Sequence, residues 1–388
     1  MSIKQKHNSE KQFSLLLLLN VNSCHSNKFI KYFSKNDSIK NFHVFTVDPT
    51  SFNYESDNVT IISCVNFFPR MKFLGKLIFY FSALLKLRKL IRTHNFDVVH
   101  AHFATTYGLL GALASPYNFI LSLWGSDIFV FPKKSLLWKL ILKFNLSRAK
   151  RILSTSHAMK KECKKYTSKE IEVTPFGIDT EKFKPFPPRN PIFDSEPIVI
   201  GCVKMLEIVA GVDILIHAFN LLLKNTPDTE NYKLLIVGGG SQYINLTELV
   251  LSLNIEKHVH FTGFIEPEDI PNYHNMMTIE AYPSRHESFG ISILEAMSCG
   301  KPVIVSGVEG LPEIIDAYIS GIIVYKLTKE RLYEKILELV QNTDLKLSLS
   351  KKARIHVENK YEYNKSMSLF IEIYEAYKAS SKKNNSYT

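Results

Sequence analysis

The sequence lacks the cysteine patterns that mark disulfide frameworks and structural metal sites. Its five cysteines are scattered, odd in number and free of any CxxC spacing, which indicates a reducing compartment and no structural metal. The sequence also lacks a hydrophobic run long enough to cross a bilayer. Its apolar stretch at 13–21, FSLLLLLNV, is too short and has no small-residue cleavage site after it. We therefore interpret 13–21 as a buried first strand of a parallel sheet.

The usual signs of nucleic-acid binding are missing as well. There is no zinc-ligand spacing, no RNP-like aromatic motif and no dominant basic helix. A different motif, the GxGxxG fingerprint of dinucleotide cofactors, is not matched by the run Gly238–Gly239–Gly240. The net charge of +11 and the pI near 9.2 therefore favour a membrane surface or a phosphorylated substrate as the anionic partner.

The segment 283–315, PSRHESFGISILEAMSCGKPVIVSGVEGLPEII, contains two glutamates with seven residues between them. Glu287 precedes Ser-Phe-Gly, which suits a tight loop. Apolar residues at helical spacing follow in 291–297, and a Gly-Lys-Pro stop ends them at 300–302. We therefore place Glu295 about one and a half turns into a helix, on the order of 7 to 8 Å from the helix start.

This arrangement suits an elongated anionic ligand. The unpaired backbone N–H groups of the first helical turn would lie between the two carboxylates, and a helix start of this kind favours phosphate. The site is typical of a diphosphate flanked by two hydroxyl-rich groups, as in a nucleotide sugar. The alternative interpretation makes Glu287 a helix-dipole partner and places Glu295 on a solvated helix face.

The string PSRHESFGISILEAMSCGKPVI, followed by GLPEII, closely resembles the donor-site signature of glycosyltransferase family 4. The resemblance implies an α/β protein of the GT-B class, with two Rossmann-like doubly wound domains facing across a cleft. It also implies that Glu287 and the amides of Phe289, Gly290 and Ile291 meet the sugar and diphosphate, while Glu295 holds the ribose hydroxyls. The donor is then a UDP- or GDP-sugar, with no obligatory cofactor and no metal.

Cations for the diphosphate are fewer here than in the family pattern. Lys204 stands where relatives usually have an arginine, and Ala210 where they have a lysine. Lys204 can neutralise a leaving phosphate, although it lacks the bidentate fork of arginine; the alternative is a surface lysine at a strand end. Arg285 is a second candidate cation. Gly239 permits close backbone approach to the donor.

The first half of the chain contains strands at 95–103 and 117–127 that resemble the acceptor domain of the family. Trp124 replaces the histidine that many relatives have near the reacting carbon. His102 and Asp127 are the nearest polar substitutes, and we interpret His100 as structural. His25 lies at the mouth of the first strand, where ligands collect in open α/β sheets; a surface or helix-capping role is the alternative.

The segment 173–185, VTPFGIDTEKFKP, resembles the passage between the two domains of the family, and a proline-rich run follows it. We predict an acceptor-binding domain at 1–180, joined by a returning helix at 362–380, and a donor domain at 181–361. Within the first domain, the run 67–92 mixes aromatic, leucine and basic residues (among the basic ones Lys76, Lys86, Arg88 and Lys89). It predicts either an amphipathic helix on anionic lipid or a packed helix with its basic face in water.

These patterns together predict a bacterial glycosyltransferase, hexosyltransferase-like, that transfers with retention to a hydroxyl acceptor. The expected acceptor is a lipid-linked or growing cell-surface glycan, as in lipopolysaccharide or capsule biosynthesis. The expected location is the cytoplasm, with peripheral attachment to the inner face of the membrane. The alternatives are a GT-B epimerase or phosphorylase, although no pyridoxal phosphate lysine motif is present, and a non-catalytic protein that binds sugar nucleotides.

Overall fold

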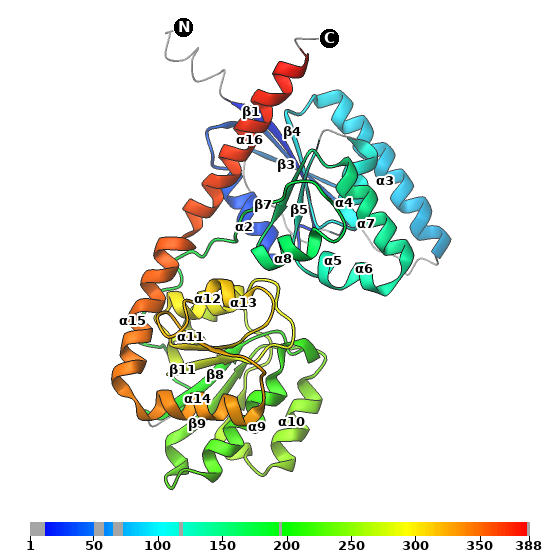
Figure 1. The fold of residues 1–388 in the computed structure, drawn as a ribbon. Helices are drawn as coiled ribbons and strands as arrows, with labels where there is room; N and C mark the ends of the chain where they lie inside the picture. The colour runs from blue at the N-terminus through cyan, green and yellow to red at the C-terminus, as the bar shows by residue number, and fades with distance from the viewer. Residues whose placement is uncertain (1–11, 50–57, 65–72, 116–118, 194–195, 386–388) are drawn as a thin grey trace, which may run out of the picture. The chain divides into compact units, whose positions relative to one another are not determined.

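The computed structural model describes residues 12–49, 58–64, 73–115, 119–193 and 196–385. It divides the chain into two compact units (Figure 1). Unit 1 consists of Met1–Pro175 and Ser366–Thr388, and unit 2 of Phe176–Lys365. The sequence placed these divisions at 180 and 361. Parts of two predicted elements, 67–72 and 117–118, lie outside the described residues.

Unit 1 is built on a seven-stranded parallel sheet with the order β3-β2-β1-β4-β5-β6-β7. All six residues of β1 are buried, as the predicted apolar strand requires. From β1 the strand order runs outward in one direction through β2 and β3, and in the other direction through β4 to β7. The switch point of the sheet therefore lies between β1 and β4. The strands are β1 Phe13–Leu18, β2 Ile39–Thr46, β3 Val59–Ser63, β4 Val98–His102, β5 Ile120–Leu123, β6 Arg151–Ser154 and β7 Glu172–Val173.

Helices separate most of the strands of unit 1, and serines cap two of these helices. The Ser135 hydroxyl accepts a hydrogen bond from the Trp138 N–H, and the Ser156 hydroxyl from the Met159 N–H. The long helix α3 and α7 both pack against α4. The helices are α2 Cys24–Phe33, α3 Phe73–His94, α4 Thr106–Ala114, α5 Ser126–Phe129, α6 Phe131–Lys134, α7 Leu136–Arg148 and α8 His157–Cys163.

The last helix, α16 (Tyr363–Asn385), brings the end of the chain back to unit 1 (Figure 1). Its Phe370 ring packs edge-on against Phe29, with centroids 5.0 Å apart. The Tyr374 hydroxyl lies 2.6 Å from His100 Nδ1. The returning helix was predicted at 362–380, and the structure continues it to Asn385.

Unit 2 has a six-stranded parallel sheet with the order β10-β9-β8-β11-β12-β13. Its order reverses between β8 and β11, so the loops after these strands lie at the switch point. The strands are β8 Ile198–Val203, β9 Tyr232–Val237, β10 Val259–Phe261, β11 Ile279–Tyr282, β12 Val303–Ser306 and β13 Ile322–Val324. The α-helices are α9 Val212–Lys224, α10 Tyr243–Ser252, α11 Ile270–Met276, α12 Ile291–Ser298, α13 Leu311–Ile314, α14 Lys329–Gln341 and α15 Thr343–Lys360.

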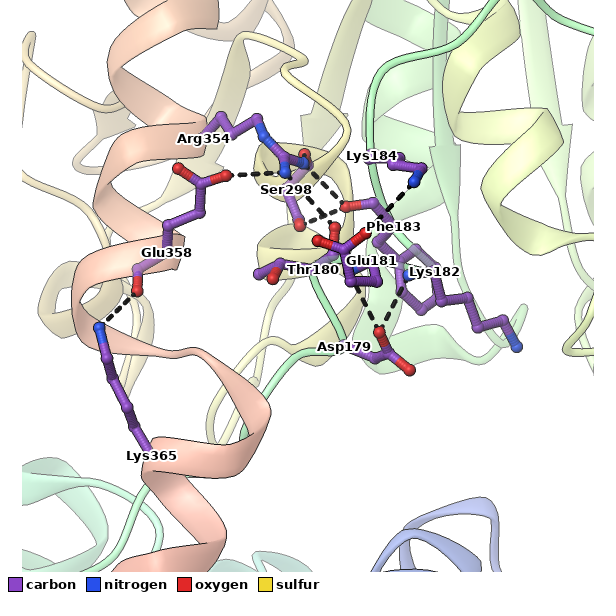
Figure 2. A network of polar contacts seen from close by, with 10 residues as sticks. All are labelled: Asp179, Thr180, Glu181, Lys182, Phe183, Lys184, Ser298, Arg354, Glu358 and Lys365. Atoms are coloured by element: carbon purple, nitrogen blue, oxygen red, sulfur yellow. Dashed lines mark hydrogen bonds and ion pairs between the residues drawn. The ribbon is translucent and has the colours of Figure 1, made fainter.

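Arg354 of α15 binds both the carboxyl end of α12 and the segment 173–185 (Figure 2). Its guanidinium donates to the carbonyls of Ser298 at 2.6 Å and Phe183 at 3.2 Å, and pairs with Glu358 at 2.7 Å. The Ser298 hydroxyl also donates to the Phe183 carbonyl at 2.5 Å. The bond to Ser298 satisfies a carbonyl at a helix end that would otherwise be left unpaired, and the bonds to Phe183 tie the segment 173–185 to that helix end.

Two doubly wound parallel α/β units confirm the predicted fold class. Within the described part of the chain, no helix combines the length and the apolar character needed to span a bilayer.

Candidate functional site

The loop between β11 and α12 carries the first of the two predicted glutamates. Glu287 lies in this loop, and α12 begins at Ile291, so the predicted loop-to-helix change is confirmed. Gly290 caps the helix at φ +95°, and a Cβ atom there would lie 2.8 Å from Leu311 Cδ2. Glycine is therefore required by both the backbone angle and the space available.

Lys204, which directly follows β8, forms an ion pair with the Glu287 carboxylate. Both side chains are mostly buried, with exposed fractions of 14% for Lys204 and 20% for Glu287. Partial burial strengthens such a pair relative to one in bulk water. The structure thus brings together the predicted cation and the predicted sugar-binding carboxylate at the switch point of unit 2.

Glycines allow the loops after β8, β9 and β11 to pack against one another. A Cβ atom on Gly211 would lie 1.9 Å from the Pro283 carbonyl oxygen, and one on Gly238 would lie 1.9 Å from the Lys204 carbonyl oxygen. At Gly239 the nearest atom would be 3.5 Å away. Gly211 and Gly238 therefore allow the loops to touch backbone to backbone, while the space beside the Gly239 backbone stays open.

Arg285 fixes the loop between β11 and α12, because its guanidinium is paired within unit 2. Its guanidinium donates to both carboxylate oxygens of Asp213, at 2.7 and 2.6 Å, and to the Ile208 carbonyl at 2.9 Å. Burial disfavours the charged Asp213 carboxylate, but hydrogen bonds and charge from Arg285 hold its pKa below the usual value. A contact between Arg285 and the diphosphate stays a prediction.

The remaining residues of the predicted donor site lie on or next to α12. The Phe289 ring is buried and packs edge-on between Phe176 and Tyr361, with centroids 5.8 and 6.0 Å away. Its backbone N–H contacts Glu287 Oε1 at 3.5 Å. Ile291 and Glu295 are half-buried in the first two turns. The ring of Phe289 therefore anchors the loop, and only its amide remains a candidate donor group.

Sequence reasoning missed Glu309, which supports the Glu287 loop from the turn before α13. Its carboxylate accepts the Glu287 N–H at 2.9 Å and lies 3.0 Å from His286 Nδ1. Glu309 has a φ of +42°, which is uncommon for a residue other than glycine. In the sequence, the one sign of this role is an acidic residue inside the turn Val308–Glu309–Gly310.

At the carboxyl edge of the unit 1 sheet, three predicted residues gather around aromatic rings. His102 ends β4, Trp124 follows β5, and His25 lies in the first turn of α2. The Trp124 ring packs edge-on against His102 at 5.1 Å and His25 at 6.1 Å, measured between centroids. Phe29 covers His102 from another side at 4.8 Å. Trp124 thus occupies this edge as a packed aromatic ring.

Burial keeps His102 uncharged. The residue is 1% exposed, and neither ring nitrogen has a hydrogen-bond partner among the described residues. Desolvation lowers the pKa of His102 to about 3, so its ring is neutral at physiological pH. His100 instead contacts Tyr374 and the Ser122 hydroxyl, the latter at 2.8 Å, in agreement with its structural interpretation.

Asp127 is fully buried and binds backbone groups of its own unit. Its carboxylate accepts the N–H groups of Ala104 and Gly125 at 2.7 Å each and that of Trp124 at 3.2 Å. Burial raises the pKa of Asp127 against these hydrogen bonds, which lower it. Because both oxygens are occupied, Asp127 holds the loop after β5 in shape. A contact between Asp127 and the substrate stays a prediction.

Two family models match the chain. The model described as "Glycosyl transferases group 1" matches residues 184–356, and "Glycosyl transferase 4-like" matches 14–156. An uncharacterized glycosyltransferase of Methanocaldococcus jannaschii is 27% identical over 86% of this chain and 89% of its own. The N-acetyl-alpha-D-glucosaminyl L-malate synthase of Bacillus anthracis is 25% identical over 74% of this chain and 77% of its own.

A similar fold is known from Anabaena HepE, whose structure was solved in complex with UDP-glucose. It superimposes with a TM-score of 0.74 at 19% identity and covers 94% of this chain and 100% of its own.

Proposed function

Since this chain belongs to the GT4-type glycosyltransferases and has their GT-B fold, we propose that it transfers a sugar from a nucleoside-diphosphate sugar to a hydroxyl acceptor with retention at the anomeric carbon. The observation that carries this proposal is the Lys204–Glu287 pair, which lies at the switch point of unit 2 beside the start of α12. Similarity to HepE, a protein bound to UDP-glucose in its structure, supports a UDP-sugar as the first donor to test.

The chemical task is to stabilise a departing diphosphate while positive charge develops on the sugar. In the proposed site, the first-turn amides of α12 and the Lys204 ammonium face the diphosphate, where preorganised charge lowers the barrier. Glu287 then holds the sugar and Glu295 the ribose. Gly239 lets the backbone approach the donor, and His25 stays a predicted donor contact. Lys204 supplies most of the positive charge that faces the diphosphate, because Ala210 is buried and uncharged and Arg285 is paired with Asp213.

The test is a thermal-shift screen of UDP-, GDP- and ADP-sugars. A bound donor raises the apparent stability by RT ln(1 + [L]/Kd), so the correct nucleotide raises Tm. Glu287→Gln serves as the site variant, and its shift should be smaller. NMR of the product then reads the anomeric configuration. The absence of a shift with every sugar nucleotide, or a product with inverted configuration, would contradict the proposal.

We further propose that the acceptor is lipid-linked or lies at an anionic membrane surface, as in the assembly of a cell-surface glycan. The charge is divided unequally between the units: unit 1 has 29 Lys and Arg against 12 Asp and Glu, and unit 2 has 19 against 25. Each basic residue close to an anionic leaflet contributes about 1 kcal/mol to attachment. The charge of unit 1 thus favours a membrane, with α3 as the predicted contact.

Vesicle sedimentation at low and high salt tests this location. Binding should require anionic lipid and weaken with salt, because salt screens exposed charges. A chain that stays in the supernatant at low salt would favour a soluble acceptor, such as the malate named for the Bacillus anthracis relative.

A further inference from the structure

The first turns of α7 expose three leucines to solvent. Leu136 is 70% exposed, Leu137 is 65% exposed and Leu140 is 55% exposed. Exposed lysines surround them on α6 and α7: Lys133, Lys134, Lys139 and Lys143. Single exposed leucines need no explanation, but a group of three on one short segment indicates an interaction surface.

The first half of α3 exposes a second apolar group. Leu77 is 59% exposed, Ile78 is 62% exposed and Phe81 is 61% exposed. We call these three residues and the three α7 leucines the edge patch. Since α3 and α7 both pack against α4, the two parts of the edge patch belong to one layer of helices in unit 1.

Topology places both parts of the edge patch at the carboxyl edge of the sheet. Helix α3 leads directly into β4, and α7 leads into β6, so each helix ends at the amino edge and begins at the opposite one. Figure 1 shows the bluer, N-terminal end of α3 and helix α6 on the same side of unit 1. His102 and Trp124 lie at this same carboxyl edge, where open α/β sheets bind their ligands.

Most of the charge around the edge patch is positive, and the one acidic partner of its lysines among the described residues is Glu162, whose carboxylate lies 3.8 Å from Lys133 Nζ. No Asp or Glu occurs between Asp127 and Glu162, and none occurs between Asp57 and Asp97, while Lys and Arg are frequent in both intervals. This composition would oppose contact with a second copy of the same surface, because the lysines would repel each other. An anionic bilayer instead accepts the apolar side chains and attracts the lysines.

Two of the basic residues expected to face lipid have another task in the structure. Lys86 Nζ donates to the Ser63 carbonyl at 3.0 Å. The Arg88 guanidinium donates to the Leu113 carbonyl at 2.9 and 3.2 Å. The C-terminal half of α3 therefore uses two of its cations to bind neighbouring backbone, which leaves its N-terminal half as the better candidate for lipid contact.

We propose that the edge patch inserts into an anionic bilayer, with Leu137 and Leu140 of α7 as its anchors and Lys133, Lys134 and Lys139 at headgroup level. This inference rests on the proposed membrane acceptor and makes it more specific, because it assigns the contact to α7 and to the first half of α3. It places the lipid surface beside the edge of unit 1 where an acceptor would bind.

The test compares Leu137→Gln/Leu140→Gln with the parent chain by sedimentation with phosphatidylcholine vesicles that contain or lack phosphatidylglycerol. A matched control is Leu251→Gln/Leu347→Gln, which changes two leucines of unit 2 with exposed fractions of 59% and 61%. Because two apolar side chains no longer leave water, the partition coefficient of the α7 variant should fall roughly tenfold or more. The control should bind like the parent, and both variants should keep the donor-dependent thermal shift.

A second measurement uses the parent chain and does not depend on a substituted leucine. Trp138 lies between Leu137 and Lys139 on α7, so vesicles with brominated acyl chains should quench its fluorescence. The quenching should disappear in Trp138→Phe, which leaves Trp124 as the remaining tryptophan.

The outcomes separate this inference from the proposed function. If the α7 variant sediments as well as the parent, or Trp138 is not quenched, the inference is overturned, while the membrane location itself stands as long as the parent binds anionic vesicles. If the parent binds its donor but ignores anionic vesicles, the membrane location fails as well and the transferase remains. If the parent is a dimer that Leu137→Gln/Leu140→Gln dissolves, the edge patch is an interface between copies.

Discussion

Lys204 is the residue on which the proposed chemistry depends most directly. Its ammonium pairs with Glu287, and negative charge on a departing diphosphate would draw it away from that carboxylate. Because its charge should matter most in the transition state, Lys204→Ala should lower kcat by a factor on the order of 10² to 10³, while Lys204→Arg should keep much of the activity. Steady-state kinetics at saturating donor measure both.

Arg285→Lys is the matched control for the Lys204 series. It retains a positive charge but cannot form the bidentate pair with Asp213. We expect lower stability with a smaller loss of kcat. Transfer at the parental rate by Lys204→Ala would instead mean that another group neutralises the phosphate.

His102 makes a prediction about pH. Its folded-state pKa is about 3, below the ordinary value near 6.5, so between these values the unfolded chain binds a proton that the folded chain does not. Stability should therefore fall as pH drops from 6.5 toward 3, by up to about 1.4 kcal/mol per pH unit from this group. Urea unfolding of the parent and His102→Phe at pH 7 and pH 5 measures the difference.

The variant should lose this part of the pH dependence and keep the part due to His100, whose pKa burial also lowers. If parent and variant lose equal stability between pH 7 and pH 5, then His102 does not remain neutral in the folded chain.

At the scale of elements, the start of α12 depends on Gly290. In Gly290→Ala, the φ of +95° and the close approach of Leu311 should together destabilise the chain by about 1 to 3 kcal/mol. Because the strain lies at the proposed phosphate-binding turn, donor affinity should fall as well. Isothermal titration with the donor and urea unfolding measure the two effects.

Gly263→Ala is the control, since its φ is also positive, at +68°, but no atom lies within 4 Å of the added Cβ. It should lose some stability and keep donor affinity. Equal loss of affinity in both variants would show that backbone strain in general, rather than the α12 start, weakens binding.

The sequence could predict elements whose signals are local. The loop at Glu287, the helix after Gly290 and the buried strand β1 are each specified by neighbouring residues, and the structure confirms them. Contacts between distant parts of the chain carry no such signal. Lys204 pairs with a glutamate 83 residues away, and Arg285 with an aspartate 72 residues away. Asp127 accepts hydrogen bonds from the backbone N–H groups of Ala104, Trp124 and Gly125. These bonds depend on the geometry of the loop, which the sequence does not show.

At the scale of the whole molecule, the chain has two units with separate sheets and separate helical layers. Calorimetry should therefore resolve two unfolding transitions. A donor that binds mainly to unit 2 should raise the temperature of one transition more than that of the other. A Gly290→Ala chain should show little donor-dependent shift. A single transition that moves as one peak would mean that the units unfold together.

The return of α16 to unit 1 has a consequence for how the protein is made. Phe13 of β1 and His100 of β4 both contact Tyr374, a residue that the ribosome adds only after all of unit 2. At roughly 5 to 20 residues per second, unit 1 waits on the order of ten seconds or more with this side of its sheet uncovered. Unit 2, whose residues are contiguous, can close first. During synthesis the later half of the chain can therefore mature ahead of the earlier half, and the nascent strands of unit 1 are the ones that need protection from aggregation.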